Sequence, residues 1–284
     1  MPELPEVEVL ARHLQPLLRD QVICGVSVRR ARVSRPTSVA GLRRALVGSS
    51  FVNLTRRGKY LLFTLRRPGS RRTFPLLGHL GMTGRMYLLP ANVALPKHTA
   101  VLLQLARGRF VFEDTRYFGR LTLDTKAVSA LGPEPLGERF TARDLRNALR
   151  CSGQPLKVKL LDQSLVAGLG NIYASETLFR ARLSPRRRAD QLSREQAQCL
   201  WRSLRQVLRE AIARGSTVRL HWGPGEGRDS LFYYGAAEGE AGYDHEHLRV
   251  YDRAGQPCLR CGTTIRRIVQ GARSTFYCPR CQRC

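Results

Sequence analysis

Lysine and acidic residues are scarce in this chain of 284 residues. Only five of its 48 basic residues are lysine, and its 22 acidic residues leave a formal net charge of +26. The preference for arginine over lysine can arise from a GC-rich genome alone. Genome composition does not explain the net charge, because self-repulsion of that size destabilises a compact protein unless something compensates it. We therefore expect a polyanionic partner, of which nucleic acid is the commonest.

Other absences narrow the class of protein. No run of about 18 apolar residues is present, which argues against a membrane-spanning helix. The opening residues lack the basic and apolar regions of a signal peptide, so we expect a cytoplasmic protein without a membrane partner. Hydrophobic residues make up 43% of the chain, too many for a mainly disordered state. The length suits one large or two ordinary domains.

The pattern of apolar residues changes along the chain. Helical spacing predicts a helix over residues 5–18. Short apolar runs between about 21 and 125 predict an antiparallel β-rich domain. The clearest runs are 22–28, 60–65, 100–105, 110–112 and 121–123. A Gly- and Pro-rich stretch at 131–136 excludes helix and central strand, and it predicts a linker.

Helical patterns dominate after this linker. The predicted helices are 142–150, 156–161, 172–180 and 194–214. Ser193 followed by Gln196 resembles a capping box at the start of the last helix. Arg202, Arg205 and Arg209 fall on one face of that helix, and we expect a solvated face there in preference to a binding surface.

Four of the eight cysteines form two pairs, each of the form Cys-x-x-Cys, with sixteen residues between the pairs. They are Cys258, Cys261, Cys278 and Cys281. Two such pairs on a hairpin complete a tetrahedral zinc site of four thiolates, which has no open position. We therefore expect one structural zinc ion. The residues from 258 to 284 also hold six arginines and no acid, which suits phosphate contact.

The remaining cysteines show no such pattern. We expect Cys24, Cys151 and Cys199 to be small buried residues. Cys284 is surplus to the four ligands.

The N-terminus is chemically unusual, because three carboxylates lie within the first eight residues of a basic protein. Removal of Met1 would leave Pro2 with a free secondary amine. Roughly a tenth of such an amine is unprotonated at pH 7, against about one in 2,500 for lysine. It is thus a ready nucleophile for a sugar aldehyde carbon, with an adjacent carboxyl to move protons. On this segment alone, the simpler interpretation of Pro2 as a helix leader is favoured.

Further motifs favour the interpretation of Pro2 as a nucleophile. Besides the opening MPELPEVE and the cysteine pairs, they lie at 57–62, 79–84, 114–119, 131–136, 161–163, 166–176 and 272–282. In this order, and over nearly the full length, they closely resemble those of the bacterial formamidopyrimidine-DNA glycosylases. The resemblance implies excision of oxidised purines, such as 8-oxoguanine and formamidopyrimidines, followed by β,δ-elimination at the abasic site.

The resemblance also implies roles for particular residues. Pro2 matches the amine that attacks C1′ of the damaged nucleotide and forms a Schiff base. Glu3 matches the acid that assists sugar opening, and Glu6 the second acidic residue of the helix start. Lys59 matches a lysine that assists β-elimination, and Arg273 an arginine that grips the phosphates flanking the lesion. No catalytic metal or nucleotide cofactor is implied.

A second set of matches concerns DNA contact. An enzyme that extrudes a base must fill the vacated space with apolar or planar side chains. Met82, Arg116 and Phe118 match the residues of the family that do so, and Arg116 would also read the orphaned cytosine. His98, Lys157 and Asn171 match further DNA contacts. We expect core or surface roles for the other five histidines.

The chain departs from the family at two places. Many members have two basic residues before the Phe, whereas this chain has Arg116 and Tyr117, so one phosphate contact is lost or replaced by stacking. The region from about 221 to 247 is longer and matches poorly, which leaves the base preference open. An endonuclease VIII-like glycosylase for oxidised pyrimidines is one alternative, although Leu4 favours the purine type. A non-catalytic zinc-ribbon DNA-binding protein is the other.

We expect an α+β fold: an N-terminal antiparallel β-sandwich with flanking helices, then a helix–two-turn–helix domain with a zinc-ribbon hairpin. The expected divisions are a catalytic domain 1–130, a linker 131–141, a DNA-binding domain 142–220, a lesion-capping loop 221–247 and a zinc finger 248–284. The expected partner is double-stranded DNA that contains oxidised bases. We expect a monomer, associated with the bacterial nucleoid through DNA.

Overall fold

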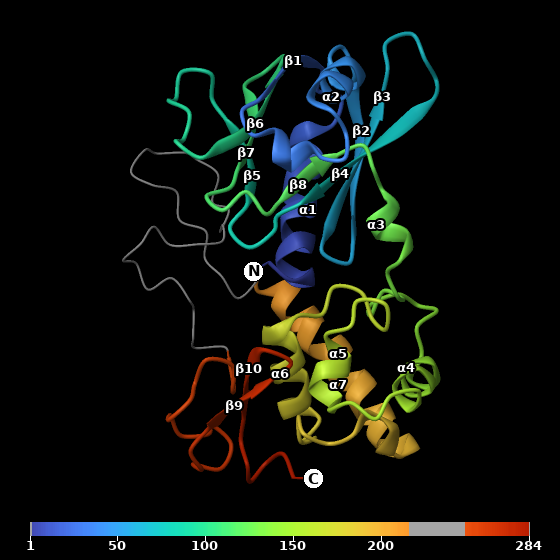
Figure 1. The fold of residues 1–284 in the computed structure, drawn as a ribbon, viewed down its shortest axis with the longest axis vertical. Helices are drawn as coiled ribbons and strands as arrows, with labels where there is room; N and C mark the ends of the chain where they lie inside the picture. Colours follow the sequence, from blue (N-terminus) through green and yellow to red (C-terminus); the bar gives the residue numbers. More distant parts are fainter. Residues whose placement is uncertain (1, 216–247, 284) are drawn as a thin grey trace. The chain divides into compact units, whose positions relative to one another are not determined.

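The computed structural model describes residues 2–215 and 248–283, which belong to two compact units (Figure 1). Among these residues, the first unit contains Pro2 and residues 6–129. The second contains residues 3–5, 130–215 and 248–283. Within the described ranges, no helix is both long and apolar enough to cross a membrane. The expected lesion-capping loop, 221–247, lies outside the described residues.

Two four-stranded antiparallel sheets form the first unit. One has the strand order β1-β6-β7-β5, with β1 Ile23–Val28, β5 Arg85–Leu89, β6 Thr99–Leu105 and β7 Arg109–Glu113. The other has the order β2-β3-β4-β8, with β2 Ser50–Arg57, β3 Tyr60–Arg66, β4 Thr73–His79 and β8 Arg120–Thr122. The sheets bury their facing side chains in one common core, and this confirms the expected sandwich.

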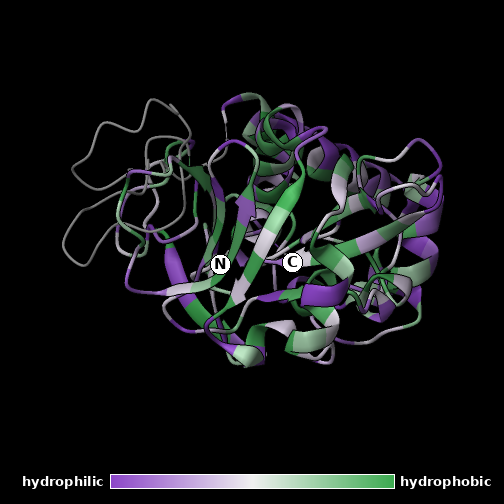
Figure 2. Ribbon diagram, turned by 90° about the horizontal axis from the view of Figure 1, so that it is seen from above, coloured by the Kyte–Doolittle hydropathy of each residue, from purple (hydrophilic) through white to green (hydrophobic). Residues whose placement is uncertain are grey.

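Alternation of side chains explains why these strands pair. In β3, Leu61, Phe63 and Leu65 are fully buried, and the residues between them are partly exposed. Strands in Figure 2 accordingly carry hydrophobic segments interrupted by hydrophilic ones. Phe63 meets Phe110 of the other sheet edge to face, with ring centroids 5.8 Å apart. Helices α1 (Leu4–Leu18), α2 (Val39–Leu46) and α3 (Lys126–Ser129) and the 3-10 helix η1 (Ala31–Ser34) flank the sheets.

The second unit is helical. Its helices are α4 Ala142–Arg150, α5 Leu156–Leu160, α6 Asn171–Arg180 and α7 Arg194–Ala213, with the 3-10 helix η2 Ala189–Gln191. Every residue of α6 from 172 to 179 is buried, which makes α6 the central helix of the unit. Strands β9 (Arg266–Gln270) and β10 (Arg273–Tyr277) form a hairpin. Gly271 and Ala272 both have positive φ in its turn, the conformation that matches strand twist.

The predicted helices and strands are confirmed with end points shifted by two residues or fewer. The capping box is also present, with Ser193 and Gln196 bonded to each other's backbone N–H groups. The prediction for Arg205 was wrong. Its Nη1 donates to the carbonyls of Pro135 and Gly137 at 2.9 and 2.8 Å, so it is buried and ties the linker to α7. Arg202 and Arg209 are exposed, as expected.

A second correction concerns the cysteines outside the zinc motif. Cys24, Cys151 and Cys199 are exposed. Cys24 occupies an outward position of β1, and Cys151 caps the end of α4, where burial is not required.

Candidate active site

Lys59 lies in the two-residue turn of the β2–β3 hairpin, after Gly58, whose φ is +57°. Its side chain is buried. The turn is tied to helix α1 by Arg56, whose Nη1 donates to the Gly58 carbonyl at 3.1 Å and whose Nε donates to Glu8 at 2.7 Å. Burial acts to raise the pKa of Glu8, but hydrogen bonds from Arg56 and Arg12 outweigh it, and the net pKa is lowered. Glu8 is therefore a fixed anion that orients the Lys59 turn.

His79 links this turn to the next loop. Its ring lies 4.7 Å from the ring of Tyr60, and its Nδ1 accepts from the Gly81 N–H at 3.1 Å. Burial lowers the pKa of His79 to about 4, helped by the positive charges of Lys59 and Arg120. His79 is therefore neutral at pH 7. The sequence did not single it out, because its partners come from separate turns and strands.

Met82 and Phe118 are both 42% exposed, although both are large and apolar. They stand on separate loops that the buried carboxylate of Asp114 joins. Asp114 accepts from the Thr83 hydroxyl at 2.6 Å, from the Arg116 N–H at 3.1 Å and from the Gly119 N–H at 2.8 Å. One carboxylate thus fixes both loops, and it presents Met82, Arg116 and Phe118 from the same unit.

Glycine allows these two loops to approach closely. A Cβ on Gly81 would lie 2.6 Å from the backbone nitrogen of Gly119, and the φ of Gly81 is +64°. A Cβ on Gly119 would lie 2.5 Å from the ring of Phe112. Neither position accommodates another residue without movement of the loops.

His98 lies beside Tyr117. The Tyr117 hydroxyl and His98 Nδ1 are 3.5 Å apart, at the limit of a hydrogen bond. The φ of Tyr117 is +52°, in the left-handed region that bulky residues rarely occupy. Tyr117 packs partly against the core of the sandwich, whereas Phe118 is exposed.

Pro2 is buried in the first unit, and the peptide bond to Glu3 leads into the second unit. The Glu3 carboxylate is buried at the N-terminus of α6. It accepts from the N–H groups of Ile172 at 2.9 Å and Tyr173 at 3.3 Å. These donors lie in the first helical turn and would otherwise lack an intrahelical partner, and the helix dipole favours a negative charge there.

The segment before α6 is shaped to receive the chain terminus. The Leu4 N–H donates to the Gly168 carbonyl at 3.0 Å. A Cβ on Gly168 would lie 2.7 Å from Leu4, and a Cβ on Gly170 only 2.3 Å from the Glu3 carboxyl carbon. The two glycines of the 166–171 motif therefore make room for residues 3 and 4.

Lys157 of α5 is completely buried, and it forms a cluster with Asn171 and β10. Its Nζ donates to Asn171 Oδ1 and, at 3.4 Å, to the Ser274 carbonyl. Asn171 Nδ2 donates to the same carbonyl at 2.9 Å. Burial and the charge of Arg273 lower the pKa of Lys157 to about 8, against an opposing effect of Glu3. Arg273 itself is exposed at the start of β10.

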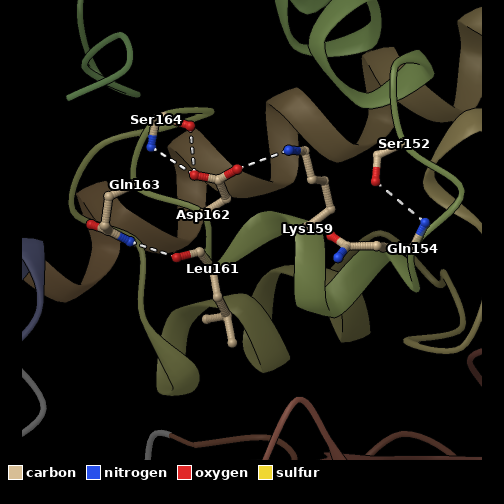
Figure 3. A network of polar contacts seen from close by, with 7 residues as sticks. All are labelled: Ser152, Gln154, Lys159, Leu161, Asp162, Gln163 and Ser164. Carbon is tan, nitrogen blue, oxygen red and sulfur yellow. Dashed lines mark hydrogen bonds and ion pairs between the residues drawn. The ribbon is translucent and has the colours of Figure 1, made fainter. Parts of the chain in front are cut away.

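The loop between α5 and α6 is rigidly bonded (Figure 3). Asp162 accepts from Lys159 at 2.8 Å and from both the N–H and the hydroxyl of Ser164. The hydrogen bonds from Lys159 and Ser164 lower the pKa of Asp162 to about 2. Gln163 bonds the carbonyls of Leu161 and Leu169 and accepts from the Gly168 N–H. The loop that carries Gly168 is therefore fixed at both ends.

The four paired cysteines meet in one cluster, and all their sulfur atoms lie within 4.8 Å of one another. Tetrahedral zinc with bonds of about 2.3 Å requires sulfur atoms about 3.8 Å apart. The Cys258–Cys281 and Cys261–Cys278 distances are 3.9 and 3.5 Å, so the set fits one zinc ion. Bound zinc would fix the loops at the base of the β9–β10 hairpin, which carries Arg273.

The predicted site residues therefore fall into two groups. In the first unit, the Lys59 turn joins the loop of Met82 through His79, and Asp114 joins that loop to Arg116 and Phe118. In the second unit, Glu3 caps α6, and Lys157 and Asn171 bond the strand that begins with Arg273. His79 and Asp114 are the positioning residues that the sequence did not reveal.

A β-sandwich, a helical unit and a four-cysteine hairpin that fits zinc, in a chain of net charge +26, are features of a zinc-containing protein that binds nucleic acid. Three family models together match most of the chain. They are the formamidopyrimidine-DNA glycosylase N-terminal domain at residues 1–121, the H2TH domain of the same glycosylases at 131–221, and the zinc finger found in FPG and IleRS at 255–283. The chain belongs to the formamidopyrimidine-DNA glycosylase family.

Similar proteins and solved structures support the same family assignment. The formamidopyrimidine-DNA glycosylase of Desulfitobacterium hafniense is 40% identical, over 99% of this chain and all of the relative. That of Novosphingobium aromaticivorans is 42% identical over the full length of both. Lactococcus lactis Fpg in complex with DNA containing an abasic site has a TM-score of 0.85, with 32% identity over 99% of this chain and 100% of that chain. MutM with DNA containing carbocyclic 8-oxo-G has a TM-score of 0.85, with 33% identity and full coverage of both.

Proposed function

We propose that this protein is a bifunctional DNA glycosylase and AP lyase of base-excision repair that removes 8-oxoguanine and formamidopyrimidines. The observation that carries the proposal is the placement of Glu3. The N-terminus of α6 holds its buried carboxylate by two hydrogen bonds. Glu3 directly follows Pro2 in the sequence. A carboxylate fixed next to a potential secondary amine is the arrangement that Schiff-base chemistry at C1′ requires.

The chemistry follows from the groups present. The amine of Pro2, free after removal of Met1, attacks C1′ of the damaged nucleotide, and the base departs. Glu3 moves protons during sugar opening. The resulting iminium withdraws electrons, so the 3′ and then the 5′ phosphate can be eliminated, with Lys59 and Arg273 assisting. No step requires a metal or a nucleotide cofactor.

We propose that Met82, Arg116 and Phe118 fill the space left by the extruded base. Their exposure on loops fixed by Asp114 supports this role. A side chain that replaces a base binds more strongly if its loop is already ordered before DNA binds, because less conformational entropy is then lost. Lys157, Asn171 and Arg273 would contact the phosphates near the lesion, and His98 a phosphate further along. Glu6 would be the second acidic residue of the site.

We propose the domain divisions 1–130, 131–141, 142–220, 221–247 and 248–284, with 221–247 covering the extruded purine. We also propose that the protein acts as a cytoplasmic monomer associated with the nucleoid. The net charge of +26 supports DNA association without naming a sequence.

A panel of duplexes under single-turnover conditions tests this function. Each duplex carries 8-oxoguanine, a formamidopyrimidine, an oxidised pyrimidine or no lesion. We expect excision of the two purine lesions opposite cytosine and cleavage on both sides of the sugar. Faster excision of oxidised pyrimidines would favour the endonuclease VIII-like alternative, and binding without excision of any base would favour the non-catalytic alternative.

A further inference from the structure

Three arginines of the first unit make cation–π contacts with the rings of two consecutive residues, Tyr117 and Phe118. Arg30 Cζ lies 5.0 Å from the centre of the Tyr117 ring. Arg32 and Arg116 Cζ lie 5.5 and 5.2 Å from the centre of the Phe118 ring. All three arginines are exposed. They come from two segments about 85 residues apart in sequence, so the fold and not the local sequence brings them together.

The segment of Arg30 is anchored where it can hold this position. The N–H groups of Arg29 and Arg30 both donate to the Ala100 carbonyl, at 2.9 and 3.3 Å. Ala100 belongs to β6, two residues after His98. On the other side, Val33 and Ser34 are buried. Arg30 is therefore carried on an ordered strand end.

The cluster has no anionic partner. Within residues 2–215 and 248–283, no carboxylate pairs with Arg30, Arg32 or Arg116. Each guanidinium lies within 6 Å of a ring centre, where the ring quadrupole attracts the cation without neutralising its charge. A guanidinium held by a cation–π contact makes no hydrogen bond to the ring carbons, so its N–H groups remain able to donate to a phosphate. The cluster therefore favours the approach of a phosphate backbone.

We propose that Arg30 and Arg32 are DNA-phosphate contacts, and that Arg30, held over the Tyr117 ring by a cation–π contact, supplies the positive charge that Tyr117 itself lacks. The proposal rests on the proposed function, since it takes the DNA to lie against the surface that presents Met82 and Phe118. Tyr117 then acts as a platform that orients a cation carried by another segment. Its left-handed backbone conformation turns the ring toward Arg30 and His98.

The test is the salt dependence of duplex binding. Arg30→Gln removes the charge and keeps much of the side-chain length. We expect it to lower the slope of log Kobs against log salt by about one and the affinity at 0.1 M salt by about five- to tenfold, for damaged and undamaged duplex alike. The matched control is Arg71→Gln, an exposed arginine on the β3–β4 turn, which we expect to keep the wild-type slope. An unchanged slope for Arg30→Gln, or an equal fall for Arg71→Gln, would overturn the proposal.

A double-mutant cycle tests the role of Tyr117. We expect Tyr117→Leu to weaken binding less than Arg30→Gln does, and the double variant to bind no worse than Arg30→Gln alone. Additive losses would show that the ring does not act through Arg30. Melting temperatures of all variants separate binding from folding. Borohydride trapping of the wild type tests the proposed glycosylase function separately, because absence of an adduct would contradict that function. The salt slopes of duplex binding test the Arg30 contact whether or not an adduct forms.

Discussion

Lys59 and Lys157 are both buried in a chain that has only five lysines. Burying an ammonium group is costly unless hydrogen bonds or a lowered pKa compensate it. Lys157 has both, since Asn171 and Ser274 accept from its Nζ and its pKa is lowered to about 8. A phosphate bound beside Lys157 would stabilise the protonated amine and so offset the cost of burying it.

The pKa of Lys157 leads to a pH prediction. Below about pH 8 the amine is charged and attracts phosphate, and above it the proton and the attraction are lost. We therefore expect duplex binding to weaken between pH 7 and 9, with a salt slope lower by up to about one. Lys157→Met should bind more weakly at pH 7 and lack this pH step. Lys126→Met, which removes an exposed lysine, is the control that should keep it; the same step in Lys157→Met would contradict this assignment.

At the level of elements, the sequence predicted what is encoded locally. Helix α7 could be predicted because its apolar spacing and its Ser193–Gln196 capping box lie within the helix itself. Lys59 was found through its motif. Asp114 and His79 were not singled out, because their partners are brought together only by the folded sheets. Arg205 was predicted wrongly for the same reason, since the carbonyls that bury it lie about 70 residues earlier.

The loops of Met82 and Phe118 give a test at this scale. Gly81 and Gly69 have nearly the same φ, +64° and +66°, but a Cβ meets the Gly119 backbone only at Gly81, whereas nothing lies within 4 Å at Gly69. We expect Gly69→Ala to cost about 1 kcal/mol of backbone strain. Gly81→Ala should cost about 1–3 kcal/mol more and slow excision, because Met82 is displaced.

Urea unfolding and single-turnover excision measure these two effects. Equal stability losses in the two variants, with excision unaffected in both, would show that the close packing of the two loops does not matter for the reaction.

On the scale of the whole molecule, the four-cysteine cluster supports the hairpin from which DNA contact is proposed. The four cysteines hold the base of the hairpin that carries Arg273, and β10 in turn accepts from Lys157 and Asn171. We therefore expect loss of the metal to disturb the proposed phosphate contacts and to leave the proposed reaction of the Pro2 amine in place.

Cys278→Ser tests this relation. We expect it to lose zinc, by atomic absorption, and to bind lesion duplex at least tenfold more weakly, since several of the proposed phosphate contacts depend on the hairpin. Cys151→Ser changes an exposed cysteine outside the cluster and should retain zinc and binding. Wild-type binding by a zinc-free Cys278→Ser protein would contradict a structural role for the metal.

The net charge of +26 also acts at this scale, because it supplies affinity for any duplex and carries no information about the reaction. In the proposed mechanism, only the few groups around Pro2 and Glu3 select the reaction. The central claim is therefore about one amine.

Borohydride trapping tests that claim most directly. Protein verified by mass spectrometry to begin at Pro2 is incubated with a duplex that carries 8-oxoguanine opposite cytosine, and the imine is reduced. We predict a covalent protein–DNA adduct whose peptide map places the link at the nitrogen of Pro2. Absence of an adduct with every oxidised base, or attachment at a lysine in place of Pro2, would contradict the account.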